Sequence, residues 1–351
     1  MQAISETKLN ALLGQMVSDL GAAVNGVLVI IGDKLGLYKA LATAPATSQQ
    51  LAERTGTAER YVREWLAAQA ASGYVTYEAT TQHFHLSPEQ AAVFADDESP
   101  ARMTGGFYMV EAVFASEPHL SDVFRTGKGL SWSDHCNCLF CGTEKFFQPS
   151  YRANLVASWL PALDGVTQKL ERGAKVADVG CGLGASTIIM AQAYPNSHFY
   201  GFDYHAPSID QARELAATAG VNNVTFDVAS AKAYPGTGYD LVAFFDCLHD
   251  MGDPVGASAH VRTTLDRAGT WLIVEPFAHD TLEQNLNPIG RVSYGFSTTV
   301  CVPSSLSQEV GLGLGAQAGE ARLREVVTAG GFTHFRRATE TPFNLILEAR
   351  P

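Results

Sequence analysis

The feature that most limits the possible folds is an alternation of short β-rich runs with helical segments, which begins at Lys175. Short apolar runs at this spacing are typical of strands that helices cover on both faces. The pattern therefore predicts a doubly wound, Rossmann-like α/β sheet, and a final pair of runs divided by Pro342 brings the expected number of strands to seven. In chain order the runs are KVADV, HFYGFD, VTFDV, YDLVAFF, TWLIVE, HFRRATE and FNLILEAR.

A mainly helical region precedes this sheet. The stretch TSQQLAERTGTAERYVREWLAAQA carries apolar residues at helical spacing on both sides of Gly56, which predicts a helix, a turn and a second helix. The next stretch, YVTYEATTQHFHLS, alternates apolar and polar residues around a polar tip, as a β-hairpin does. We therefore expect a winged helix within residues 1–100, an aromatic-rich helical connector over residues 101–170 that contributes to a substrate pocket, and the α/β domain over residues 171–351.

The charge of the chain limits its partners. Its formal net charge is −12, and residues 1–100 hold six Lys or Arg against eleven Asp or Glu. A surface of this sign repels phosphate, so we expect the winged helix to bind no nucleic acid and to form a homodimer instead. Its first helix carries more apolar residues than one small domain can bury, among them Leu12, Met16 and Leu20, which supports the dimer.

The N-terminal sequence carries no targeting pattern. MQAISETKLNALLGQM lacks a charged region followed by an unbroken apolar core, so we expect a cytoplasmic protein. The most apolar run, residues 22–32, is about ten residues long, against roughly 20 for a bilayer span. This run is predicted to be a buried helix, and no membrane partner is expected.

A glycine-rich loop follows the first run of the α/β domain, in the stretch VADVGCGLGAST. Gly180, Gly182 and Ala185 fit the G-x-G-x-x-A pattern of dinucleotide folds, in which the loop holds a pyrophosphate. Asp178 indicates a different ligand, because a carboxylate repels pyrophosphate but attracts an ammonium or sulfonium group. The loop therefore predicts a site for a nucleoside cofactor that carries positive charge.

The stretch Asp178–Gly184 resembles the first motif of class I S-adenosylmethionine-dependent methyltransferases, and the resemblance extends from about Gly173 onward. It implies S-adenosyl-L-methionine as the cofactor. An acidic residue at the end of the second run can bind both ribose hydroxyls, and this place holds Asp203. The place beside the adenine, commonly acidic in the family, holds Ser230. The implied cofactor contacts are Asp178, Gly180, Cys181, Gly182, Asp203, Tyr204, Ser230, Ala231 and Asp246.

After the fourth run, LHDMGDP resembles the L-H-D-W-S-D segment of small-molecule O-methyltransferases related to plant caffeate methyltransferases. In that family the matching histidine removes a proton from a hydroxyl acceptor, so the resemblance implies His249 as general base. Glu275, at the end of the fifth run, is expected to orient the imidazole. The alternative is that His249 caps the helix that follows, near Asp253. Over its whole length the chain is more similar to bacterial winged-helix methyltransferases, most of whose acceptors are unassigned.

These resemblances imply methyl transfer to a small-molecule acceptor, with a hydroxyl as the leading choice. The stretch NLNPIGRVSYGFSTTVCVPSSLSQE is similar to the lid of such enzymes. A non-enzymatic alternative is a cofactor-sensing transcription regulator that uses the winged helix on DNA. The candidate acceptor contacts are Tyr108, Trp132, Arg291 and Tyr294.

Three of the six cysteines lie close together, at positions 136, 138 and 141. Thiolates at this density can bind Zn²⁺ or a soft metalloid, which leaves methylation of a sulfur or metalloid acceptor at Cys136, Cys138 and Cys141 as an alternative function. A metal site would need further ligands, and no second C-x-x-C that could match Cys138–Cys141 occurs elsewhere in the sequence. We therefore expect reduced thiols here and no metal.

Overall fold

The computed structural model describes residues 4–351, which divide into two compact units. One unit comprises the chain up to Ala112 together with Asn137–Pro149. The other comprises Val113–Cys136 and Ser150–Pro351. The helical connector expected over residues 101–170 is thus shared between the two, because α6 (Thr104–Thr126) and α7 (Asn137–Asn154) each continue from one unit into the other.

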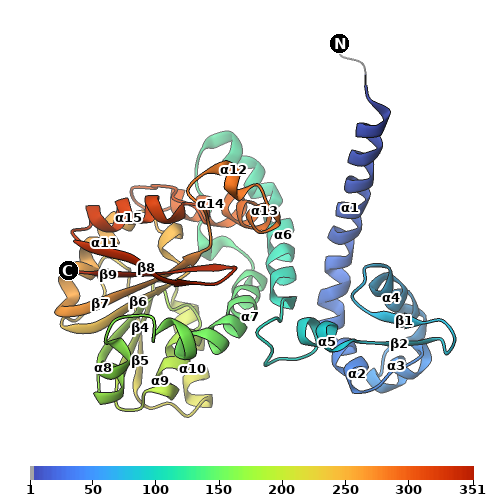
Figure 1. The fold of residues 1–351 in the computed structure, drawn as a ribbon, viewed down its shortest axis with the longest axis horizontal. Coiled ribbons are helices and arrows are strands. Elements are labelled where there is room, and N and C mark those ends of the chain that lie inside the picture. The colour runs from blue at the N-terminus through green and yellow to red at the C-terminus, as the bar shows by residue number, and fades with distance from the viewer. Residues whose placement is uncertain (1–3) are drawn as a thin grey trace. The chain divides into compact units, whose positions relative to one another are not determined.

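The first unit contains the predicted helix–turn–helix and hairpin (Figure 1). Thr47 and Gln50 form a capping box that starts α3, and Gly56 ends this helix in the left-handed conformation with φ of 64°. In the hairpin, Tyr77 pairs with Phe84 as the alternation predicted. The elements of this unit are α1 (Glu6–Lys34), α2 (Leu37–Thr43), α3 (Ser48–Thr55), α4 (Glu59–Ala71), β1 (Thr76–Glu78), β2 (His83–His85) and α5 (Pro88–Phe94).

Helix α1 differs from the buried helix predicted over residues 22–32. Val29 and Ile30 are buried in the core of the first unit, but Val24 and Val27 are exposed. The apolar run is part of a helix of 29 residues whose N-terminal half is almost wholly exposed. Within residues 4–351 it is the one helix with the length and apolar composition that a bilayer span requires, a combination that core helices also show.

The second unit is built on the predicted seven-stranded sheet, with the strand order β5-β4-β3-β6-β7-β9-β8. The first five strands are parallel, and β9 runs antiparallel to both of its neighbours. Because β3 and β6 are adjacent central strands, their carboxyl ends meet where the strand order reverses, which is where open α/β sheets bind ligands. The strands are β3 (Lys175–Val179), β4 (His198–Asp203), β5 (Val224–Val228), β6 (Tyr239–Phe245), β7 (Leu265–Pro276), β8 (His334–Glu340) and β9 (Asn344–Arg350).

Helices cover both faces of this sheet (Figure 1). Phe202 and Trp271 belong to the larger core cluster, which packs under α11 and α15, whereas Phe226 packs against α10 on the opposite face. A segment of short helices follows β7, where the sequence predicted a lid. The helices of this unit, beyond α6 and α7, are α8 (Val166–Arg172), α9 (Ala185–Ala193), α10 (Ala206–Thr218), α11 (Pro254–Thr264), α12 (Leu282–Asn285), α13 (Pro288–Phe296), α14 (Val302–Leu306) and α15 (Gly319–Ala329).

Candidate active site

Four acidic residues mark the carboxyl edge of the central strands in the second unit. Asp178 is the penultimate residue of β3 and Asp203 ends β4, while Asp246 follows β6 and Glu275 lies near the end of β7. In the sheet these strands are consecutive neighbours. The predicted cofactor loop and the predicted base are therefore brought to one edge.

The glycines of the loop after β3 differ in what surrounds them. Gly180, Gly182 and Gly184 all have positive φ, at 75°, 52° and 82°, a conformation that residues other than glycine rarely adopt. A Cβ at Gly180 would lie 2.8 Å from Sγ of Cys247, and one at Gly184 would lie 2.7 Å from the ring of Phe226. A Cβ at Gly182 would meet nothing within 4 Å. The loop therefore leaves open space over Gly182, where a ligand can approach the backbone.

Asp178 is fully buried beneath this loop. Ser186 and Thr187 donate hydrogen bonds to its Oδ2, at 2.7 and 2.6 Å, while its buried Oδ1 has no hydrogen-bond partner. Burial raises the pKa of Asp178 to about 6, although the two hydroxyls lower it. A half-satisfied buried carboxylate is a suitable partner for a cationic ligand group, so Asp178 and the open side of Gly182 fit an S-adenosylmethionine-like cofactor.

Asp203 is held by the backbone on both oxygens. Gly182 N donates to its Oδ2 at 3.0 Å and His205 N donates to its Oδ1 at 2.8 Å. Burial raises the pKa of this carboxyl, and the two amides oppose the shift. Each oxygen keeps a further lone pair for a ribose hydroxyl. The remaining predicted contacts are less enclosed: Tyr204 and Ser230 are exposed, and Ala231 is half-buried.

Asp246 has two hydrogen-bond donors that the sequence did not identify. Tyr151 Oη donates to its Oδ2 at 2.8 Å, and Nδ2 of Asn344, the first residue of β9, donates to its Oδ1 at 3.0 Å. Burial and the charge of Glu275 together raise the pKa of Asp246 to about 7. Asp246 also has φ of 50°, and left-handed residues other than glycine are concentrated at functional sites.

His249 and Glu275 form a buried pair. Nδ1 of His249 lies 2.5 Å from Oε2 of Glu275, and the Leu248 backbone amide donates to the other oxygen, Oε1, at 2.9 Å. Nε2 of His249 lies 3.1 Å from Oδ1 of Asp250. Burial lowers the pKa of the imidazole, but the two neighbouring carboxylates outweigh it and hold the pKa well above its ordinary value.

The alternative role of His249 as a helix cap is wrong. Asp253 caps α11 itself, because its Oδ1 accepts a hydrogen bond from Gly256 N at 2.8 Å. The His249 side chain is directed to carboxylates instead.

The four candidate acceptor contacts lie in different surroundings. Tyr108 is buried in the first unit, where its hydroxyl donates to Asp33 at 2.7 Å. Trp132 lies in a 3₁₀ turn of the second unit and is half-buried. On α13, Arg291 is exposed and Tyr294, one turn later, is half-buried.

The cysteine cluster is not a set of three thiols in the structure. Cys136 and Cys138 are disulfide-bonded, whereas Cys141 is a free, exposed thiol. A disulfide sulfur does not offer a thiolate, so in this state Cys141 alone could bind a soft ligand. The expectation of reduced thiols is wrong for the first two cysteines.

Cys301 is a functional candidate that the sequence did not identify. It ends a π-helical turn, Ser297–Cys301, inside the segment that resembled a lid, and its side chain is buried near His249 and Asp250. Its position could not be inferred because 51 residues lie between it and His249 in the sequence, and no periodicity links the two.

Two family models match the chain. Residues 170–299 match a methyltransferase domain. Residues 23–95 match an Rv2258c-like winged HTH domain. The first match contains the glycine loop and His249, and the second contains the helix–turn–helix and hairpin.

Solved structures share the fold over nearly the whole chain. An O-methyltransferase family protein from Burkholderia thailandensis has a TM-score of 0.69 at 17% identity, covering 99% of both chains. Human N-acetylserotonin methyltransferase in complex with SAM has a TM-score of 0.70 at 16% identity, again over 99% of both chains. The SAH-bound form of CalO1, a methyltransferase in calicheamicin biosynthesis, has a TM-score of 0.68 at 17% identity, over 99% of this chain and 100% of that one.

Two curated relatives match short segments of the chain. The uncharacterized protein sll1526 of Synechocystis is 42% identical over 57 residues, which are 16% of this chain and 11% of that protein. A tRNA (guanine-N(7)-)-methyltransferase of Edwardsiella ictaluri is 33% identical over 75 residues, which are 20% of this chain and 32% of that protein. The chain thus covers about a third or less of the length of these two relatives.

Proposed function

We propose that this chain, an S-adenosylmethionine-dependent methyltransferase with an N-terminal winged-helix domain, methylates a hydroxyl group of a small-molecule acceptor and uses His249 as the general base. The observation that carries the proposal is the buried pair of His249 and Glu275 at the carboxyl edge of the sheet, 2.5 Å apart. A histidine fixed by a carboxylate on Nδ1 presents Nε2 as its proton acceptor. The fold family of the solved structures, which includes O-methyltransferases, supports the choice of oxygen.

S-adenosylmethionine supplies an electrophilic methyl group on a positively charged sulfur. Asp178, with its unpartnered Oδ1, would attract the positive charge of this cofactor, and the open side of Gly182 would admit it close to the backbone. Asp203 would accept the ribose hydroxyls. The remaining proposed contacts are Gly180, Cys181, Tyr204, Ser230, Ala231 and Asp246.

His249 would act on the acceptor hydroxyl. The acceptor hydroxyl would give its proton to Nε2 of His249 as its oxygen takes up the methyl group that the cofactor would supply. Glu275 stabilises the imidazolium that results, because its carboxylate lies on Nδ1. Oδ1 of Asp250 lies 3.1 Å from Nε2. The Asp250 side chain must therefore either move aside when the acceptor hydroxyl binds or leave room for the hydroxyl next to it.

The acceptor would lie against the segment that follows β7. Trp132, Arg291 and Tyr294, all in the second unit, are the proposed contacts there. Their mixture of rings and one cation suits an aromatic hydroxyl compound. Tyr108 belongs to the first unit and stays a prediction from the sequence.

The winged-helix unit would hold two copies of the chain together. Leu12, Leu13, Met16, Val17 and Leu20 of α1 are each roughly half exposed or more, which is an extended apolar surface on one helix. At 100° per residue, Gln15 and Asp19 lie outside this apolar arc, so the helix is apolar on one side only, which suits a second protein surface better than a bilayer span. We therefore place the protein in the cytoplasm as a homodimer.

DNA would not be the partner of this unit. On α4, the helix that would enter a groove, Arg60 pairs with Glu64 and Arg63 pairs with Glu59, so its cations are already neutralised. An electrophoretic mobility assay at low salt, where non-specific binding is strongest, should show no retardation. Sequence-dependent retardation would favour the regulator instead.

The direct test is transfer of a labelled methyl group from S-adenosylmethionine to a panel of phenols, amines and thiols, followed by substitution of the base. We expect a phenol to be the best acceptor, and His249→Ala to lower kcat about 10²- to 10⁴-fold with little change in cofactor affinity. His119→Ala, which removes an exposed histidine of the same unit, is the control. Full activity in His249→Ala would refute the base, and a preference for thiols would refute oxygen as the target.

A further inference from the structure

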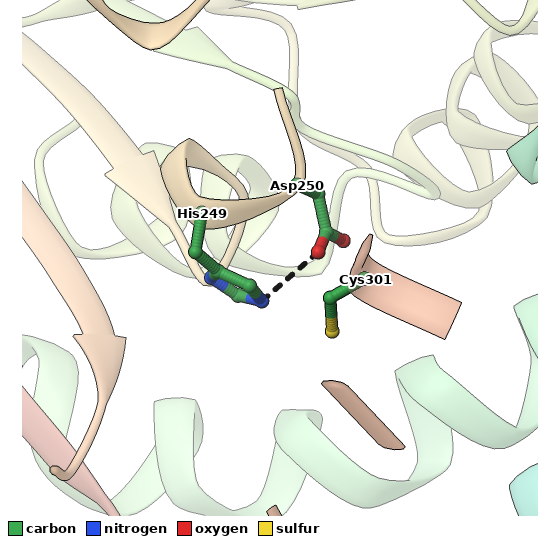
Figure 2. Close-up of side chains that lie close together, drawn as sticks. All are labelled: His249, Asp250 and Cys301. Atoms are coloured by element: carbon green, nitrogen blue, oxygen red, sulfur yellow. Dashed lines mark ion pairs between the residues drawn. The ribbon is translucent and has the colours of Figure 1, made fainter. Parts of the chain in front are cut away.

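A second group of side chains shares His249 but meets at its other ring nitrogen. Nε2 of His249, a carboxylate oxygen of Asp250 and Sγ of Cys301 all lie within 4.8 Å of one another. Figure 2 shows the three side chains converging. His249 and Asp250 belong to the 3₁₀ turn after β6, and Cys301 ends the π-helical turn Ser297–Cys301. Across residues 4–351, no other three His, Cys, Asp or Glu side chains come together in this way.

The group is sheltered from water and incompletely satisfied. His249 and Cys301 are 4% and 6% exposed, and the Asp250 side chain is 23% exposed. Oδ1 of Asp250 is buried, and although Nε2 of His249 lies 3.1 Å away, the two atoms lack the geometry of a hydrogen bond. A buried carboxylate oxygen without a donor costs free energy, and a bound cation would remove that cost.

The three donor atoms together select the kind of cation. Mg²⁺ and Ca²⁺ take oxygen ligands, so an imidazole nitrogen and a sulfur argue against both. Zn²⁺ binds nitrogen, oxygen and sulfur, and zinc sites with three protein ligands keep a fourth position for water or another molecule. The partial exposure of Asp250 leaves a side from which that fourth ligand can enter.

The surroundings of His249 are those of a metal ligand. Histidines that bind zinc commonly donate the proton of their other nitrogen to a carboxylate, which fixes the ring and directs the free lone pair at the metal. Glu275 lies 2.5 Å from Nδ1 and is itself held by the Leu248 amide. Cys301 ends a π-helical turn, and such turns occur frequently at functional sites.

We infer that His249, Asp250 and Cys301 form a zinc-binding site. Binding displaces the proton of the Cys301 thiol and occupies the lone pair of Nε2. An imidazole whose lone pair is bound to zinc cannot accept a proton from a hydroxyl, so zinc would oppose base catalysis at this residue. The binding itself does not depend on His249 being the base.

The test is an equilibrium titration of the purified full-length chain with Zn²⁺, in competition with a chromophoric chelator and without added thiols. We expect one equivalent to bind, and both Cys301→Ser and Asp250→Asn to weaken its affinity by at least about tenfold, since even an outer-shell partner of a metal ligand contributes that much. Co²⁺ in place of Zn²⁺ should give a thiolate-to-cobalt absorption band that Cys301→Ser abolishes.

Cys141→Ser is the matched control, because Cys141 is the free thiol of the other cysteine cluster and is exposed. It should leave both the zinc affinity and the cobalt band unchanged. Thermal unfolding of each variant shows whether it is folded, and Asp250→Asn keeps the test valid if Cys301→Ser does not fold. Failure of the wild-type chain to bind Zn²⁺ would overturn the inference. Binding that depends on Cys141 and not on Cys301 or Asp250 would overturn it as well.

Discussion

The carboxylate of Glu275 holds both the Nδ1 atom of His249 and the backbone amide of Leu248, one on each oxygen. One side chain therefore fixes the orientation of the imidazole and the shape of the turn that carries it. Because the carboxylate accepts from Nδ1, the neutral imidazole leaves Nε2 without a proton, which is the form that a base requires.

Glu275→Gln should lower kcat about as much as His249→Ala does. The amide oxygen can still accept from the Leu248 amide, but the amide nitrogen then faces Nδ1 and donates to it, which forces the proton onto Nε2. Steady-state kinetics should therefore show a loss of about 10²- to 10⁴-fold in kcat, with the affinity for S-adenosylmethionine retained. A Glu275→Gln variant with near wild-type kcat would show that the charge is structural only. Glu340→Gln, at an exposed glutamate of β8, is the control.

Binding of S-adenosylmethionine should weaken as the pH falls below about 6. The pKa of Asp178 is raised by burial to about 6, and the cofactor's positive charge favours the ionised carboxylate. Binding therefore releases a proton near this pH, and the affinity at pH 5 should be roughly tenfold lower than at pH 7. Calorimetry at pH 6 in two buffers of different ionisation enthalpy measures the proton directly. In Asp178→Asn the affinity should be lower and should change less over this range, in which Asp246 with its pKa of about 7 still titrates. An undiminished proton release in this variant would contradict the assignment.

Gly182→Ala and Gly184→Ala should separate cofactor binding from stability. Both positions have positive φ, so each alanine costs about 1–2 kcal/mol of backbone strain. At Gly184 the new methyl also meets the ring of Phe226, which should add roughly 1–3 kcal/mol to the loss measured by urea unfolding. At Gly182 the methyl has free space in the protein and should act mainly on the ligand, so calorimetry should show the larger loss of affinity there. Equal stability losses in the two variants would contradict this account.

Tyr151→Phe should destabilise the protein more than Tyr234→Phe. The hydroxyl of Tyr151 donates to the buried carboxyl of Asp246, whereas that of Tyr234 is bonded to the hydroxyl of Thr264. Losing a bond to a charged group costs about 1.5–3 kcal/mol, against about 0.5–1.5 kcal/mol for a neutral pair. Urea unfolding at pH 8, where Asp246 is ionised, gives the comparison. A larger loss in Tyr234→Phe would indicate that Asp246 is protonated and needs no donor from Tyr151.

A charge on the apolar surface of α1 should dissociate the proposed dimer. Val17→Glu places a carboxylate at a position that is 69% exposed in one chain and would be buried in the dimer, which costs several kcal/mol of association free energy. Sedimentation equilibrium should then find monomers, while Gln15→Glu, at a position that is already polar, should remain dimeric. If the wild-type chain is itself a monomer at micromolar concentration, the proposed interface is wrong.

The sequence predicted those parts of the molecule that depend on local pattern. The strand runs and the glycine loop are continuous segments, so periodicity and spacing were sufficient for them. Tyr151, Asn344 and Cys301 could not be predicted, because each reaches the site from a segment distant in the chain and no motif marks the residue itself. The partial exposure of residues 22–32 was missed for another reason, because an apolar run looks the same whether its own domain or a second molecule covers it. The excess of apolar residues did predict the exposure of Leu12, Met16 and Leu20.

Strand β9 has a consequence for how the protein is made. It comes last among the strands in sequence, yet it lies between β7 and β8 in the sheet, and its first residue, Asn344, donates to Asp246. While the chain is being synthesised, β7 leaves the ribosome with an apolar edge that has no partner until β9 follows. Such edges promote aggregation. The nascent chain therefore passes through a vulnerable interval, and the cofactor edge is completed only after residue 344 has emerged, so the cofactor cannot stabilise the chain before that point.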